Sequence, residues 1–190
     1  MPTSARVARL GDAAIEVVAR DGLRGLTHRA VDSEAGLPAG STSYYARTRG
    51  ALVELTFGRI VELDVEHTEL DVDHSAPDVD ELALALADLL HHSITAGRSR
   101  TLARYELALE ADRRPGLRAV YDRGGARLRD RAAEVVVSLG SDAPRRHAAM
   151  LVAWFDGMLF DAVAGAGPVL TRAELVECAR DMLRACGGRA

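Results

Sequence analysis

The chain has 190 residues, of which 48% are hydrophobic and only 4% aromatic, so it is long enough to bury a mainly aliphatic core. All 24 basic residues are arginine, and the formal net charge of −4 argues against a protein coated all over in nucleic acid. Residues 1–60 hold eight arginines against six acids and residues 61–190 hold sixteen against twenty-two, which predicts contact with a polyanion such as DNA at one end only.

Helical periodicity and turn residues predict four helices in the first 70 residues. The first runs over about 3–21 and is predicted to end at Gly22, because helices commonly end at a residue in the left-handed conformation, which glycine adopts readily. Thr27 caps a second helix over about 28–35, and a glycine turn follows it. Pro38 opens a third helix over about 39–45, and a longer fourth helix covers about 50–70.

The third predicted helix is weak, because residues 40–43 read Gly-Ser-Thr-Ser and have low helix propensity. Neighbouring helices must therefore hold it in place. Its small side chains let the backbone approach a partner closely, and the tyrosine pair Tyr44 and Tyr45 follows them. A short helix, a glycine turn and a second short helix predict a helix-turn-helix, which puts one helix into the major groove of DNA.

Five further helices are predicted after an acidic break over residues 71–77. Their approximate ranges are 78–96, 100–112, 115–140, 142–164 and 171–186, with a possible kink at the glycine pair 124–125. Asp78 with Glu81, and Thr171 with Glu174, have the spacing of N-terminal capping boxes. Nine helices and no credible strand predict an all-α fold.

Cys178 and Cys186 lie eight residues apart in the last of these helical patterns. Helical rise separates them by about 12 Å, which is too far for an intrachain disulfide. With no signal peptide and no apolar run of about 18 residues, the chain is predicted to be cytoplasmic with reduced thiols.

From about residue 5 to residue 55 the chain resembles the TetR (tetracycline-repressor) family of transcriptional regulators. The resemblance rests on the order and spacing of Gly22, Leu26–Thr27, Ala30–Val31, Ala35–Gly36–Leu37, Gly40, Ser41–Thr42, Tyr45, Arg49 and Leu52. It departs from the family at Ser43, where a tyrosine is common, and at Ala46, where a phenylalanine is common. Arg49 replaces the usual lysine and keeps its charge. Past residue 60 the likeness is architectural.

The resemblance implies a homodimer with a helix-turn-helix DNA-binding domain over 1–49, a connecting helix over 50–74 and a helical ligand-binding and dimerisation domain over 75–190. Such a protein would be a ligand-responsive repressor. A small-molecule inducer, which the sequence does not identify, would release it from a palindromic operator. The fourth helix would be the only direct link between the two domains.

Nine residues are predicted to contact double-stranded DNA: Thr27, Arg29, Ala39, Gly40, Ser41, Ser43, Tyr44, Tyr45 and Arg49. Residues 39–41 and Tyr44 would face the major groove, where a hydroxyl bonds base edges and a methyl group suits thymine. Thr27, Tyr45 and Arg49 would bind phosphates, which fix register without reading sequence. The structural alternatives are that Thr27 is only a cap, Arg29 a solvated side chain and one tyrosine a core residue.

Two further sets of residues are predicted in the ligand-binding and dimerisation domain over 75–190, which we call the body. An apolar pocket with a few polar groups would suit a small ligand, and its candidate residues are His91, Tyr105, Glu106, Glu110, Tyr121, Trp154, Phe155 and Met158. The eighth helix is apolar over so wide an arc that it must be buried against more than one neighbour. With the ninth helix it would form a four-helix interface between two subunits, through Leu151, Phe155, Leu159, Leu175, Ala179, Met182 and Leu183; a monomeric core would also explain both stripes.

A metal-responsive regulator of the same fold is the main alternative. The segment with Asp64, Glu66, His67, Glu69, Asp71, Asp73 and His74 is rich in metal-ligating types, and two turns of helix separate its histidines. Charge runs at helix ends are usually solvated, so no metal ligand is assigned. The chain contains no G-x-S-x-G, no H-E-x-x-H and no phosphate loop, so neither an enzyme nor a cofactor is expected.

Overall fold

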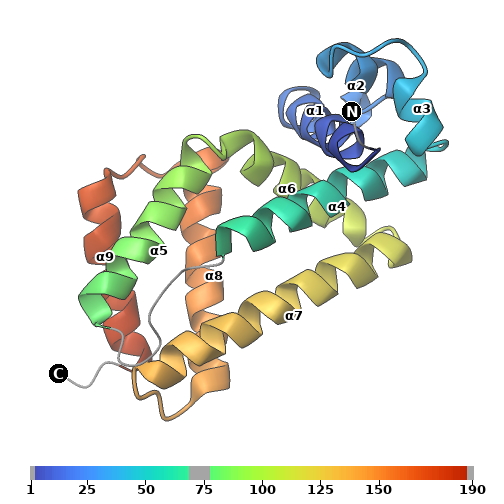
Figure 1. Cartoon of the computed structure of the whole chain (residues 1–190). Helices are drawn as coiled ribbons and strands as arrows, with labels where there is room; N and C mark the ends of the chain where they lie inside the picture. Colours follow the sequence, from blue (N-terminus) through green and yellow to red (C-terminus); the bar gives the residue numbers. More distant parts are fainter. Residues whose placement is uncertain (1–2, 69–77, 188–190) are drawn as a thin grey trace. The chain divides into compact units, whose positions relative to one another are not determined.

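The computed structural model describes residues 3–68 and 78–187, with the backbone alone for residues 3, 4 and 65–68. These residues form nine helices and no strand, which confirms the predicted all-α fold (Figure 1). The helices are α1 (Thr3–Gly25), α2 (His28–Glu34), α3 (Ser41–Tyr45), α4 (Arg49–Thr68), α5 (Val79–Ile94), α6 (Arg98–Ala111), α7 (Pro115–Ser138), α8 (Pro144–Val163) and α9 (Arg172–Cys186). None of the described helices is long and apolar enough to cross a membrane.

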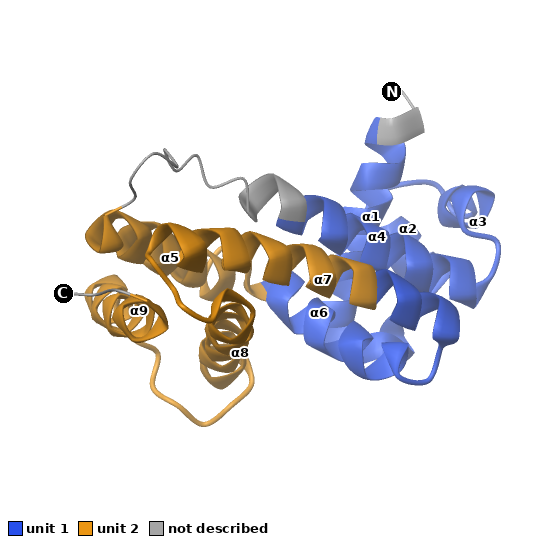
Figure 2. Ribbon diagram, turned by 90° about the horizontal axis from the view of Figure 1, so that it is seen from below, with its two compact units in different colours: residues 1–68, 99–121 blue, residues 69–98, 122–190 orange. Residues whose placement is uncertain are grey.

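The chain divides into two compact units, and the division does not follow the sequence order (Figure 2). Unit 1 contains residues 1–68 and 99–121, and unit 2 contains residues 69–98 and 122–190. Unit 1 therefore holds the helix-turn-helix together with almost all of α6 and the first turns of α7. The predicted domains over 1–49, 50–74 and 75–190 do not coincide with these units, and their boundaries stay a prediction.

Unit 1 is built around one hydrophobic cluster to which α1, α2 and α4 contribute buried residues, with Tyr45 of α3 packed against it. We call helices α1 to α4 the head. The head supplies Leu10, Val17, Leu26 and Leu52, all with no exposed surface. Residues of α6 and α7 complete the same cluster, namely Ala103, Leu107, Ala111 and Leu117. Since buried apolar surface is the main stabilising term in folding, α6 is a structural part of the head.

Unit 2 depends chiefly on the pairing of α5 with α9, with α8 packed against both. Asp78 caps α5 by accepting a hydrogen bond from the Asp80 amide at 3.2 Å. Thr171 and Glu174 form the complete capping box predicted at the start of α9. Arg172 pairs with Asp88 at 2.5 Å across these helices, although exposed pairs of this kind contribute only about 0–1 kcal/mol each.

Several predicted boundaries need correction. Pro38 does not open α3, because that helix begins at Ser41 with Gly40 in the left-handed region (φ 92°) as its N-cap. Helix α7 is unbroken through the glycine pair 124–125, and Ala143 rather than Asp142 precedes the first residue of α8. The predicted acidic break over 71–77 lies outside the described residues.

Candidate DNA-binding site

The turn between α2 and α3 is set by two glycines with positive φ and by backbone hydrogen bonds. Gly36 has φ 59° and Gly40 has φ 92°, conformations that residues with a Cβ rarely adopt. The Leu37 amide donates to the Asp32 carbonyl at 2.9 Å, and the Ser41 amide donates to the Pro38 carbonyl at 3.1 Å. The chain therefore leaves α2, turns twice and enters α3 within a few residues, as a helix-turn-helix requires.

A buried carboxylate from α2 holds the start of α3. Asp32 is only 4% exposed. One of its oxygens accepts from the Gly40 amide at 2.8 Å, and the other accepts from the Thr42 amide at 2.7 Å and the Thr42 hydroxyl at 2.6 Å. Burial alone would raise the pKa of Asp32, but these donors stabilise the anion and the net pKa is lowered.

The other end of α3 is held by a second side chain of α2. The His28 Nε2 atom lies 2.6 Å from the carbonyl oxygen of Ala46, the C-terminal cap of α3. Ala46 is itself buried, at 1% exposed, so the chain that leaves α3 passes through the core of unit 1. Both ends of α3 are thus fixed by α2, which explains how a helix of such weak propensity is formed.

Four of the nine predicted DNA contacts project from the turn and α3 into solvent: Ala39, Gly40, Ser43 and Tyr44. The Tyr44 ring is the most exposed large hydrophobic side chain of the described residues, at 76%. Tyr45 is half-buried against the core, and the two rings meet edge to face with centroids 4.9 Å apart. Tyr44 is therefore available to a partner, whereas Tyr45 serves the packing of the head at least in part.

Three predicted contacts already have bonds within the head. The Thr27 hydroxyl caps α2 by accepting from the Ala30 amide at 3.1 Å. The Ser41 hydroxyl donates to the Pro38 carbonyl at 2.6 Å, so its proton is committed to the turn. Arg49 donates to the Leu26 and Leu23 carbonyls at 2.8 and 2.5 Å, which ties α4 to the end of α1 and the chain before α2.

Some arginines of unit 1 are paired with acids and others are exposed without an ion pair. Arg20 bonds both Asp21 and Glu34, and Arg59 bonds Asp12, so these arginines are neutralised by neighbouring carboxylates. Arg29 and Arg47 are exposed and have no ion pair or hydrogen bond within the part of the chain that the structure describes. Arg29 lies on α2 and Arg47 lies two residues after the end of α3, so both add positive charge to the helix-turn-helix segment.

Sequence reasoning missed Asp32, His28 and Arg47. A signal for the first was present, because an acid that directly follows the apolar Val31 on a short helix is well placed to be buried. Nine residues later begins a helix whose own N-cap, Gly40, has no side chain to accept its amides. Nothing in the sequence pattern singles out the histidine bond to a backbone carbonyl.

The predicted ligand-pocket residues are divided between the two units. Tyr105, Glu106, Glu110 and Tyr121 belong to unit 1, and the other four predicted residues belong to unit 2. Arg114 lowers the pKa of Glu110 through an ion pair at 2.6 Å, and the Tyr121 ring lies 5.9 Å from that of Phe57. Their joint membership of one pocket remains a prediction.

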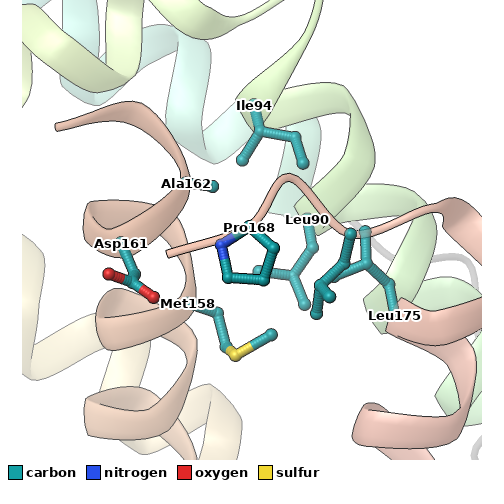
Figure 3. Close-up of a pocket in the computed structure, with 8 residues that line it drawn as sticks. Leu90, Ile94, Met158, Asp161, Ala162, Pro168 and Leu175 are labelled. Atoms are coloured by element: carbon teal, nitrogen blue, oxygen red, sulfur yellow. The ribbon is translucent and has the colours of Figure 1, made fainter. Parts of the chain in front are cut away.

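Unit 2 contains a small apolar recess of about 70 Å³ (Figure 3). It is lined by Leu90, Ile94, Met158, Asp161, Ala162, Pro168, Leu170 and Leu175, so Met158 is the one predicted pocket residue at this site. Asp161 is its only charged group, and it accepts a hydrogen bond from the Gly167 amide at 3.0 Å. The volume is well below the roughly 300–1,000 Å³ that drug-sized ligands occupy.

Five residues predicted at a dimer interface are buried within their own subunit: Leu151, Leu159, Leu175, Ala179 and Leu183. Helices of unit 2 cover these side chains, which leaves Phe155 and Met182, both half-buried, for a partner to contact. The outward face of α8 instead exposes Ala149, Met150, Ala153, Gly157 and Phe160. The outward face of α9 is charged, because Arg172, Glu177, Asp181 and Arg184 lie on it.

The predicted metal-ligating segment falls mostly outside the description. Among the described side chains, no group of three or more His, Cys, Asp or Glu residues could hold a metal ion. Asp64, the first residue of that segment, pairs with Arg100 at 3.4 Å. The other six predicted ligands belong to residues 65–77, whose side chains the structure does not describe.

Comparison with known proteins identifies the class to which this fold and site belong. The family signature described as "Tetracyclin repressor-like, C-terminal domain" matches residues 77–186. A TetR-family member from Streptomyces coelicolor A3 is similar at 30% identity with a TM-score of 0.71, covering 97% of this chain and 99% of that one. A search among curated proteins found no match.

Two further solved structures are similar over nearly the whole chain. The multidrug binding protein EbrR in complex with ethidium shares 30% identity at a TM-score of 0.70, covering 97% of this chain and 99% of that chain. A transcriptional regulator from Rhodococcus sp. Rha1 has a TM-score of 0.81 at 21% identity, with 95% of each chain covered, and so shows the fold alone. The chain belongs to the TetR family and is a ligand-responsive, DNA-binding transcriptional regulator.

Proposed function

We propose that this regulator is a homodimeric repressor that places two copies of α3 in the major groove of a palindromic operator and releases it when a small molecule binds. The observation that carries the proposal is the exposed face of α3. Ser43 and Tyr44 are exposed on α3 and Ala39 is exposed in the turn before it. Arg29 on α2 and Arg47, two residues after α3, are also exposed, whereas Arg20 and Arg59 pair with acids of the same unit. Small polar and aromatic groups flanked by guanidiniums suit base edges between phosphates.

The proposed operator lies in the DNA that flanks the gene of this regulator. Fluorescently labelled duplexes from that region should bind the protein at nanomolar concentration. The affinity for an unrelated duplex should be at least roughly 1,000-fold lower. Measurement by anisotropy at a stated salt concentration tests the proposal. Equal affinity for both duplexes would contradict it.

The inducer would act on body residues, and the proposed route to α3 is not restricted to α4. Helix α7 runs without a break from unit 1 into unit 2, and α6 begins at the junction between residues 98 and 99. The chain passes between the two units three times, so we propose that α6 and α7 can transmit the signal as well as α4. EbrR is described as multidrug binding, which supports a small organic molecule as inducer here.

Metal sensing remains the second candidate mechanism. Added zinc and a chelator should both leave operator affinity unchanged if the inducer is an organic molecule, and a response to either would favour the metal-responsive alternative. TetR-family regulators are generally non-enzymatic, and we propose no catalytic role for this chain. It would act in the cytoplasm, where its operator lies.

The dimer is proposed to form through the outward face of α8. Ala149, Ala153 and Gly157 follow one another at intervals of four and so share that face with Phe160. Small side chains in such a stripe let a second helix approach closely, and the flanking Met150 and Phe160 supply apolar area. A two-fold axis would pair this face with itself.

Ala153→Arg should convert the dimer to a monomer, because it places a charge at the centre of an apolar contact while leaving the exposed position free of clashes within the chain. Light scattering after size exclusion would show the mass fall by half. Val137→Arg, which changes another exposed apolar residue of unit 2 on α7, should remain dimeric. A dimeric Ala153→Arg variant would place the interface elsewhere.

A further inference from the structure

Helix α3 lacks the means to fix its own position. It has five residues, and its N-cap glycine offers no side chain to accept the first amides. A helix leaves its first four N–H groups without partners inside the helix, and nucleation makes isolated short helices unstable in water. Whatever holds α3 must therefore come from another part of the head.

Asp32 supplies the missing acceptor from α2. It uses both carboxylate oxygens on three donors at 2.6–2.8 Å, and all three donors belong to Gly40 and Thr42. Thr42 has no exposed surface, so the network lies on the inner side of α3, away from the exposed Ser43 and Tyr44. Charge-assisted hydrogen bonds of this length are about twice as strong as neutral ones and are directional.

We infer that Asp32 is the positioning residue for operator recognition, so that specific binding depends on its carboxylate while non-specific DNA binding does not. The inference rests on the proposed role of α3 as recognition helix. Base edges are read from α3, where a small rotation misaligns every hydrogen bond. Phosphates would be bound by Arg29, Arg47 and Arg49, whose backbones lie outside α3, and these contacts carry no sequence information.

The first test is the isosteric Asp32→Asn variant. An amide keeps one acceptor oxygen for Thr42 but turns an NH2 group toward the Gly40 amide, so the N-terminal end of α3 loses its bond. Affinity for an operator selected from random duplexes with wild-type protein should fall roughly 10- to 100-fold. Affinity for an unrelated duplex at the same salt should stay within about threefold, because its contacts are to phosphate.

A second variant and a control separate positioning from folding. Thr42→Val removes the hydroxyl donor with nearly the same shape, and its effect on operator affinity should be much smaller in an Asp32→Ala background, which has no acceptor for that hydroxyl, than alone. Ser33→Ala changes the exposed neighbour of Asp32 and should bind both duplexes as wild type. All affinities are compared at a temperature where circular dichroism shows each variant fully folded.

Amide hydrogen exchange tests the contact without DNA. Asp32→Asn should speed exchange at Gly40, whose amide loses its acceptor, but not at Ala30, whose amide is capped by Thr27. The inference is overturned if the variant keeps the wild-type ratio of specific to non-specific affinity, or if both affinities fall together in folded protein. Wild-type protein that binds every duplex equally would instead refute the proposed function, while the exchange result would still decide whether Asp32 holds α3.

Discussion

Leu107→Ala should lower the free energy of unfolding of the DNA-binding head by about 2–5 kcal/mol, although residue 107 lies far along the chain from the helix-turn-helix. Leu107 has no exposed surface and belongs to the same buried cluster as Leu10, Leu26 and Leu52. Removal of its side chain opens a cavity in that cluster, and close-packed surroundings relax only in part to fill it. Urea denaturation followed by far-UV circular dichroism gives the change.

The matched control is Leu109→Ala on the same helix. Leu109 is 70% exposed, so its truncation should change the free energy of unfolding by no more than about 0.5 kcal/mol. Amide exchange would localise the effect, with faster exchange in α1 and α4 for Leu107→Ala but not for Leu109→Ala. Equal stabilities for the two variants would mean that α6 does not belong to the core of the head.

A practical consequence is that the head should not fold when it is cut at the end of α4. A fragment of residues 1–68 keeps the helix-turn-helix but loses Ala103, Leu107, Ala111 and Leu117, which close one side of its core. Small domains bury a low fraction of their surface and have little stability to spare. Deletion studies of this regulator should therefore retain residues 99–121.

Local features of the fold were predictable because they depend on neighbours in the sequence. Gly22 and Gly36 take positive φ, as their positions after predicted helices indicate, whereas Gly40 was predicted inside the third helix. Thr171 and Glu174 form the capping box that their spacing predicts. The order and spacing of residues from Gly22 to Leu52 together indicated the family, because each position in a helix-turn-helix has a separate steric requirement.

The tertiary packing and the contacts within the site depend on which helix surfaces meet. The periodicity of apolar residues does not specify which surfaces these are. Leu175, Ala179 and Leu183 form the apolar stripe that was predicted to contact a partner, but helices of unit 2 already cover it. Such a stripe predicts that its residues are buried, but it does not predict whether the same subunit or a partner covers them. Asp32 was missed for a related reason, since its three donors lie eight and ten residues later in the chain.

Tyr44→Ala should weaken operator binding roughly 10- to 100-fold, the loss expected when a base-edge contact of about 1–3 kcal/mol is removed. The ring is 76% exposed on the proposed recognition helix, so its removal costs the free protein little. Tyr44→Phe keeps the ring and removes the hydroxyl, and it separates the two contributions. An unchanged affinity for Tyr44→Ala would exclude α3 as the reading element.

Arg49→Ala should differ from Tyr44→Ala in kind, because a phosphate contact acts equally on every sequence. Its loss should weaken specific and unrelated duplexes alike and lower the slope of log affinity against log salt by about one for each subunit. It should also destabilise the head, since Arg49 donates to the Leu23 and Leu26 carbonyls. Arg49→Lys restores the charge but not the planar fork, so it should recover the salt slope and only part of the stability.

The control for Arg49 removes an arginine whose charge is already balanced. Arg20 bonds Asp21 at 3.1 Å and Glu34 at 2.7 Å, so Arg20→Ala removes the same charge without removing a proposed phosphate contact. Its salt slope should therefore match that of wild type. If Arg20→Ala and Arg49→Ala lowered the slope equally, the net charge of the head would govern affinity. Arg49 would then be a residue that joins α1 to α4, with no direct bond to the DNA backbone.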